Sequence, residues 1–130
     1  MGKELILEQP QCLAFRSYEE RLPEADEVLL HTICTGISHG TEMRQYHNNQ
    51  VQKHWNETLR LFNGARPRAY PMVLGYDNVS RVVAVGKNVT RIQPGSIVWT
   101  DLPHRETGLV SEERALGGLL FPAEEAQTVP

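Results

Sequence analysis

The pattern of apolar and polar positions is most informative between residues 75 and 98, GYDNVSRVVAVGKNVTRIQPGSIV. β-Branched side chains that favour a pleated, buried surface recur here, namely Val79, Val82, Val83, Val85 and Val89. Gly86 interrupts the run, and we expect a tight turn or bulge with positive φ at this position. Pro94-Gly95 predicts a turn before a strand at residues 97–99. Together these elements predict a bent hairpin from a small, closed β-barrel.

Further strands are predicted on both sides of this hairpin. The apolar, β-branched run EVLLHTICTG is the clearest of them. The predicted strands cover residues 5–7, 12–17, 27–36 and 105–110. Cys12 and Cys34 lie inside these runs, where a buried, reduced thiol is expected. After Ser111 the pattern predicts no clear element, although residues 119–121 are apolar.

A helix is predicted between the strands, over residues 43–63. Thr41 is a candidate N-cap, and Glu42 suits the positive end of the helix dipole. An apolar stripe follows at helical spacing, formed by Val51, Trp55, Leu59 and Phe62. We interpret it as a helix that packs Trp55 onto the barrel, with a substrate lid as the alternative. His47 and His54 lie on its polar side and are expected to be solvated.

Size and charge narrow the function classes. The chain has 130 residues and a mass of 14.7 kDa, which suits one domain with a single core. A net charge of −3 without a Lys/Arg cluster excludes the basic surface that nucleic-acid binding needs. No apolar run approaches the ~20 residues that span a bilayer, and no apolar signal segment is found at the N-terminus. We therefore expect a cytoplasmic protein without nucleic-acid or membrane partners.

The hairpin segment resembles the medium-chain dehydrogenase/reductase superfamily, in its GroES-like catalytic domain. The similar pattern there is G-H-E-x-x-G-x-V-x-x-V-G-x-x-V-x-x-x-x-x-G-D-x-V. The matching positions are Gly75, Val82, Val85, Gly86, Val89, Gly95 and Val98, with Asp77 as a conservative variant. Three departures are functional: Tyr76 stands where zinc-dependent members have a histidine ligand, Ser80 replaces a glycine, and Ser96 replaces an aspartate.

A second resemblance lies at residues 36–42, GISHGTE. Zinc alcohol dehydrogenases carry G-I-C-x-T/S-D here, where the cysteine is a catalytic zinc ligand and the hydroxyl relays the substrate proton. In this chain Ser38 replaces the cysteine, and Thr41-Glu42 occupy the T-D place. The pair of motifs resembles a subset that includes bacteriochlorophyllide dehydrogenase-like proteins. The four-cysteine structural zinc lobe of many members is absent, because the chain has two cysteines and no C-x-x-C.

A catalytic zinc is not expected, because neutral hydroxyls at Ser38 and Tyr76 are poor zinc ligands. A substitute site made by His39, Glu42 and Asp77 is the alternative. Without zinc, donors in a water-poor cleft must stabilise the substrate oxygen. The resemblance implies four catalytic residues for this role: Ser38, His39, Thr41 and Tyr76. Their structural alternatives are helix capping for the serine and threonine, and plugging of the barrel for the tyrosine.

His39 can also exchange the proton, because the pKa of a histidine lies near neutrality. Residues that contact the substrate are predicted on the same loops and on the strand approaching the cleft: Glu42, Asp77 and His104. A solvent-exposed position on the surface would explain polar residues at His104 and Glu106 equally well.

None of the ten glycines forms the G-x-G-x-x-G fingerprint of a dinucleotide-binding domain. The resemblance therefore predicts that residues 1–130 are a mainly β, GroES-like barrel domain with one or two flanking helices, lacking the Rossmann domain that follows it in the superfamily. NAD or NADP would bind through that missing domain.

The expected function is the substrate side of a zinc-independent alcohol, ketone or enone oxidoreductase, inactive without its cofactor domain. The expected partner is a small-molecule substrate. The sequence is also compatible with a homo-oligomer. One alternative is a non-enzymatic GroES-like interaction module; the other is a zinc dehydrogenase with substitute ligands.

Overall fold

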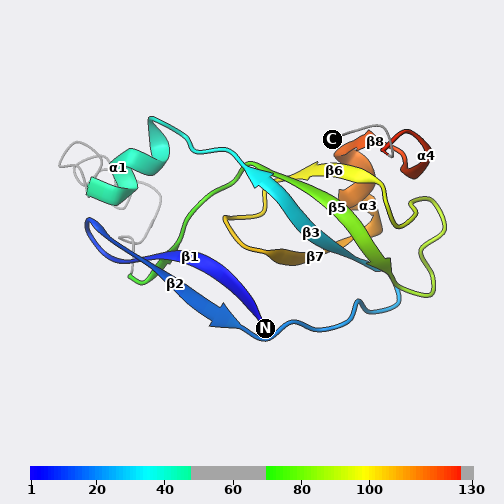
Figure 1. The fold of residues 1–130 in the computed structure, drawn as a ribbon, viewed down its shortest axis with the longest axis horizontal. Helices are drawn as coiled ribbons and strands as arrows, with labels where there is room; N and C mark the ends of the chain where they lie inside the picture. The colour runs from blue at the N-terminus through cyan, green and yellow to red at the C-terminus, as the bar shows by residue number, and fades with distance from the viewer. Residues whose placement is uncertain (48–69, 127–130) are drawn as a thin grey trace, which may run out of the picture.

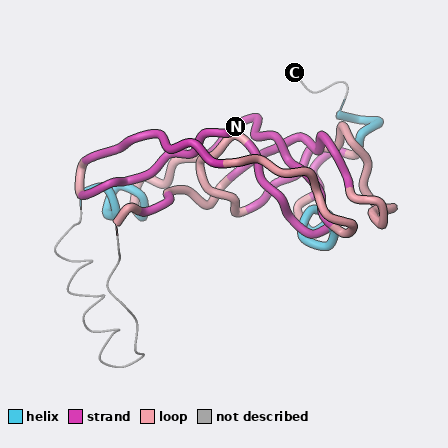
Figure 2. Tube along the Cα trace, turned by 90° about the horizontal axis from the view of Figure 1, so that it is seen from below, coloured by secondary structure: helices cyan, strands magenta, loops and turns pink. Residues whose placement is uncertain are grey.

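The computed structural model describes residues 1–47 and 70–126, which are built mainly from strands (Figure 1). α1 lies at one end of the molecule, and α3, β8 and α4 lie at the other (Figures 1 and 2). The elements are β1 (Gly2–Gln9), β2 (Cys12–Tyr18), β3 (Glu27–Thr35), α1 (Thr41–His47), β4 (Met72–Val73), β5 (Asn78–Val85), β6 (Ile97–Thr100), β7 (Thr107–Ser111), α3 (Glu112–Gly117), β8 (Leu119–Phe121) and α4 (Ala123–Ala126). The predicted mainly β fold with flanking helices is confirmed.

The strands form two antiparallel sheets. The smaller sheet has the order β2-β1-β4, and the larger has the order β7-β3-β5-β6-β8. Among the described strands, the edge strands of the larger sheet do not pair with each other, so the expected closure into a barrel is not found there. The hydrophobic alternation that predicted the strands fixes which face each one buries, but carries no information on closure.

An irregular segment after β6 connects the two sheets. On the β1 side, the Leu5 N–H donates to the His104 carbonyl at 2.9 Å, and the Glu106 N–H donates to the Lys3 carbonyl at 3.0 Å. On the β3 side, the Thr32 N–H donates to the Glu106 carbonyl at 2.8 Å. Because strands from both sheets bond to these few peptide groups, residues 104–106 hold β1 of the smaller sheet and β3 of the larger sheet together.

The main core lies under the five-stranded sheet. It is formed by Val28, Leu30, Val82, Val89, Ile92, Val98, Leu102, Val110 and Ala115. Full burial of one valine, leucine or isoleucine side chain stabilises the fold by about 1.5–3 kcal/mol. Of the valines predicted to be buried, Val82 and Val89 are in this core, whereas Val83 is 46% exposed. Successive strand residues face opposite sides, so a run of valines cannot all point inward in a sheet with one covered face.

Gly86 has a different role from the one predicted. Among the described residues, the glycines with positive φ are Gly75 and Gly95, and the latter confirms the Pro94-Gly95 turn. Gly86 instead allows two chain segments to approach closely: a Cβ at this position would lie 1.9 Å from the Glu24 carbonyl oxygen. The close approach lets the Gly86 N–H donate to the Glu27 carbonyl at 2.8 Å.

Helix α3 was not predicted, although its start carries a recognisable signal. Ser111 is its N-cap, and the serine side chain accepts a hydrogen bond from the Arg114 N–H at 3.2 Å. Glu112 follows in the first turn, where an acidic residue is favoured. The Glu112 carboxylate also accepts the backbone N–H groups of Thr90 and Arg91, at 2.8 and 2.9 Å, and so ties the loop after β5 to this helix.

Other predictions differ from the structure at single positions. Strand β7 begins at Thr107, two residues after the predicted start. Both cysteines are free thiols, but Cys34 is exposed rather than buried, because it lies on the outward face of β3. The predicted helical stripe from Val51 to Phe62, and His54 with it, lies outside the described residues. No helix in the described ranges is long and apolar enough to cross a membrane.

We predict that Gly86→Ala destabilises the protein by about 1–3 kcal/mol, because the added methyl group meets backbone atoms that have little room to move. Gly117→Ala is the matched control, since a Cβ there meets nothing within 4 Å. Chemical denaturation of both variants measures the difference. Equal stability of the two would contradict the close approach at Gly86.

A second prediction concerns Glu112, whose pKa lies below its ordinary value of 4.5, chiefly because the carboxylate accepts the Arg91 backbone N–H. A group with a lowered folded-state pKa contributes stability above its unfolded pKa and loses it as the pH falls through the folded value. The stability difference between wild type and Glu112→Gln is therefore expected at pH 7 and lost in strong acid. A difference that grows with acidification would contradict this assignment.

Candidate active site

His104 is held by four hydrogen bonds, two through its backbone and two through its ring. Its N–H donates to the Leu74 carbonyl at 2.9 Å, and its own carbonyl accepts from Leu5. Its ring Nδ1 lies 2.7 Å from the Thr35 hydroxyl, and its ring Nε2 forms a short hydrogen bond with the Glu42 carboxylate. The side chains of His104 and Glu42 are only 11% and 6% exposed.

Gly75 makes room for this histidine. Its φ is +104°, a backbone conformation that residues with a Cβ rarely adopt. A Cβ there would also lie 2.8 Å from both His104 Cδ2 and the His104 backbone nitrogen. The glycine of the G-Y-D motif therefore serves both the turn and the packing of the imidazole.

Glu42 lies in the first turn of α1, and it is buried. Besides His104, it accepts a short hydrogen bond from the Ser38 backbone N–H. The expected N-cap role of Thr41 is wrong: α1 begins at Thr41, and the Gly40 carbonyl accepts the first helical bond, from the Arg44 N–H at 3.1 Å. The Thr41 N–H itself donates to the Ser38 hydroxyl at 3.1 Å, so the serine holds the loop that enters the helix.

The two sequence motifs lie side by side. The Gly36 N–H donates to the Asp77 carbonyl at 2.8 Å, which joins the loop after β3 to the loop before β5. The Asp77 carboxylate accepts the Trp99 indole N–H and packs against Gly36. Tyr76 is 47% exposed, and His39 is exposed as well. Thus, of the predicted residues, Glu42 and His104 meet directly, and Ser38 joins them through Glu42. Among the described residues, no hydrogen bond joins Ser38 and Tyr76.

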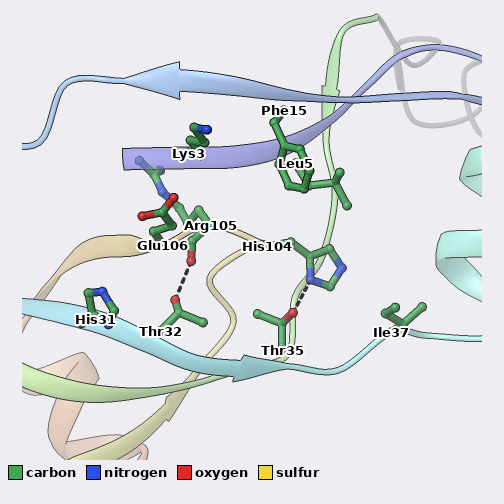
Figure 3. A pocket seen from close by; sticks show the side chains of 10 residues that line it. All are labelled: Lys3, Leu5, Phe15, His31, Thr32, Thr35, Ile37, His104, Arg105 and Glu106. Atoms are coloured by element: carbon green, nitrogen blue, oxygen red, sulfur yellow. Dashed lines mark hydrogen bonds between the residues drawn. The ribbon is translucent and has the colours of Figure 1, made fainter. Parts of the chain in front are cut away.

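A cleft of about 510 Å³ opens between the two sheets beside His104 (Figure 3). Its size is in the range of small-molecule sites. The cleft is lined by Lys3, Leu5, Phe15, His31, Thr32, Thr35, Ile37, His104, Arg105 and Glu106. Ser38, His39, Thr41 and Tyr76 are not among these residues. Thr35 and the residues from β1 were not predicted, because the sequence does not show that β1 lies opposite the end of β3.

The hydrogen-bond partners of His104 determine which ring nitrogen carries the proton. A carboxylate only accepts, so Glu42 favours the tautomer with the proton on Nε2. Nδ1 is then unprotonated and can accept a hydrogen bond from the Thr35 hydroxyl. When the ring is doubly protonated, Nδ1–H donates to the Thr35 oxygen and the hydroxyl proton turns toward the cleft. The array can thus take up or deliver a proton at the cleft wall.

The residues present do not fit the catalytic zinc of the family motif. Hydroxyl side chains stand at the cysteine and histidine places, and they are poor zinc ligands. Of the substitute ligands, Glu42 bonds to His104, and Asp77 bonds to Trp99. Within residues 1–47 and 70–126, no three His, Cys, Asp or Glu side chains are grouped to hold a metal ion.

Comparison with known proteins identifies the fold. The family model of the alcohol dehydrogenase GroES-like domain matches residues 24–118. No curated protein matches the sequence.

The similar solved structures include three oxidoreductases. Quinone oxidoreductase from Pseudomonas syringae pv. Tomato DC3000 has a TM-score of 0.58 at 18% identity and covers 95% of this chain and 34% of its own. A mutant form of enoyl thioester reductase from Candida tropicalis has a TM-score of 0.59 at 16% identity, covering 98% and 40%. Escherichia coli quinone oxidoreductase complexed with NADPH has a TM-score of 0.52 at 14% identity, covering 97% and 36%.

This chain therefore spans less than half the length of these proteins. The similarity to bacteriochlorophyllide dehydrogenase-like proteins is not confirmed by these comparisons. The match over residues 24–118 and the shared fold agree with the two motifs of the sequence. The chain belongs to the alcohol dehydrogenase GroES-like domain family of the medium-chain dehydrogenase/reductase superfamily.

Proposed function

We propose that this chain is the substrate-side catalytic domain of an oxidoreductase that uses NAD or NADP, reduces a ketone or enone or oxidises the corresponding alcohol, and needs no zinc. The observation that carries the proposal is the hydrogen-bonded chain Thr35–His104–Glu42 at the wall of the cleft. It provides acid–base chemistry at the place where a GroES-like domain would hold a substrate.

The chemistry needs a proton donor when a carbonyl becomes an alcohol. With the substrate oxygen beside Thr35, the hydroxyl proton passes to that oxygen, and the threonine oxygen takes the proton from His104 Nδ1. Glu42 keeps its hydrogen bond to Nε2 throughout, and its negative charge stabilises the doubly protonated ring before transfer. The reverse sequence removes the proton from an alcohol. Positioned proton transfer of this kind contributes typically about 10²–10⁴-fold to a rate.

The nicotinamide cofactor would supply the hydride from outside the described residues, which contain no glycine-rich dinucleotide loop. The similar quinone oxidoreductase of Escherichia coli was solved with NADPH. This supports a pyridine nucleotide, and leaves the choice between NAD and NADP to the test.

The four residues first predicted as catalytic have a supporting place in this proposal. Ser38 and Thr41 hold the loop that presents Glu42. Tyr76 and His39 are exposed on the two joined loops and do not line the cleft. Their direct catalytic role stays a prediction.

We predict that Thr35→Val lowers kcat by about 10²–10⁴-fold with little change in KM, because valine keeps the shape of threonine but cannot pass a proton. Thr35→Ser retains the hydroxyl and should retain most of the activity. The assay uses the natural full-length protein with NADH or NADPH and a panel of ketones, enones and quinones. His47→Gln, at an exposed histidine outside the cleft, is the control. Full activity of Thr35→Val would contradict the relay.

We also predict that the activity survives dialysis against a strong chelator, with less than one zinc per chain by metal analysis, because no suitable ligand set was found in the described residues. Stoichiometric zinc that is lost on His39→Ala or Asp77→Ala would instead favour the substitute zinc site.

A further inference from the structure

We propose that Ser80, Asn78 and Thr32 are positioning residues, which hold the backbone on both sides of His104 and so keep its ring aligned with Thr35. Their effect on turnover rests on the function proposed above, whereas their effect on the ring itself does not. The hydrogen bonds of these three side chains form a buried network that runs from β5 to the wall of the cleft.

The buried network begins at two side chains of β5. Asn78 and Ser80 are both 0% exposed, and the Ser80 hydroxyl donates to the Asn78 amide oxygen. The Asn78 amide nitrogen donates to the Thr32 hydroxyl at 3.0 Å and to the Pro103 carbonyl at 3.4 Å. The Thr32 hydroxyl in turn donates to the Arg105 carbonyl. These two carbonyls belong to the residues immediately before and after the histidine of the cleft wall.

The donors and acceptors of the buried network can be satisfied in one arrangement. A main-chain carbonyl only accepts, so the Thr32 hydroxyl gives its single proton to Arg105 and accepts from Asn78. The amide nitrogen of Asn78 must then face Thr32, and its oxygen faces Ser80, whose hydroxyl supplies the proton. Ser80 replaces a glycine of the family pattern, and a glycine would leave this buried oxygen without its donor.

The same two strands set the position of Thr35. Thr32 and Thr35 are three residues apart on β3, and in a regular strand they would face opposite sides. The register with β5 shifts just after Thr32, which makes Ile33 an extra residue on β3. Both threonines line the cleft, and Figure 3 shows their hydrogen bonds to the irregular segment after β6. Asn78 therefore bonds to one threonine and is the cross-strand neighbour of the other.

The ¹⁵N chemical shifts of the His104 ring test the positioning role without substrate or nucleotide. We expect Ser80→Ala to move both ring nitrogens toward the averaged shift of a free imidazole, because a loosened backbone weakens the bonds of the ring to Thr35 and Glu42. Ser96→Ala is the matched control, since Ser96 is 2% exposed and lies outside the cleft, and it should leave the ring unchanged. Unchanged ring shifts in a folded Ser80→Ala variant would overturn the proposal.

Two substitutions at Thr32 test the other end of the buried network, and they decide the matter if Ser80→Ala does not fold. Valine keeps the shape of threonine without its hydroxyl, whereas serine keeps the hydroxyl. We expect Thr32→Val to move the ring shifts and to lower kcat by about 10–100-fold with little change in KM, because a misplaced proton donor slows the chemical step. Thr32→Ser should retain both wild-type properties. Equal values for the two variants would overturn the proposal.

The outcomes at Thr35 and Ser80 separate this inference from the proposed function. Full activity of Thr35→Val together with altered ring shifts in Ser80→Ala would sink the relay and leave the positioning role intact. An inactive Thr35→Val together with unchanged ring shifts in Ser80→Ala would sink the positioning role alone.

Discussion

The structure depends on a short extended segment that two sheets share. The peptide groups of residues 104–106 are bonded to β1 on one side and to β3 on the other. Since the amide and the carbonyl of His104 are both used, its side chain projects from a backbone that cannot rotate freely. Gly75 leaves just the space that the imidazole fills. The position of the candidate acid–base group is therefore a consequence of how the two sheets are joined, and the cleft is the space beside that junction.

Burial gives the pair of His104 and Glu42 its chemical character. A carboxylate that is almost fully buried is costly unless donors surround it, and Glu42 has two, the Ser38 N–H and the imidazole. Ser38 thus supports the site through its backbone, at the place where the zinc enzymes have a ligating cysteine. In the proposed function, Glu42 of this motif belongs to an acid–base array with His104 and Thr35, which lie outside the motif.

The sequence was sufficient to predict local structure wherever one residue type had one physical role. The β-branched runs located β3, β5 and β6, and Pro94-Gly95 located a turn. Ser111 followed by two glutamates is a usable signal for α3, but this short helix has no apolar periodicity that would indicate it. Gly86 was recognised as special for the wrong reason, because a close approach between distant segments is invisible in one stretch of sequence. The site had the same limit: Glu42 and His104 were each candidates, but they are 62 residues apart, and only the fold shows that they pair.

The central claim is that Glu42 holds the neutral His104 ring with its proton on Nε2, so that Nδ1 faces the Thr35 hydroxyl. A long-range ¹H–¹⁵N correlation spectrum of the histidine side chains, assigned with a His104→Gln variant, measures this directly. For the neutral ring, the account predicts a protonated Nε2 and an unprotonated Nδ1, with the preference lost in Glu42→Gln. A proton on Nδ1, or the rapidly exchanging mixture of a free imidazole, would contradict it.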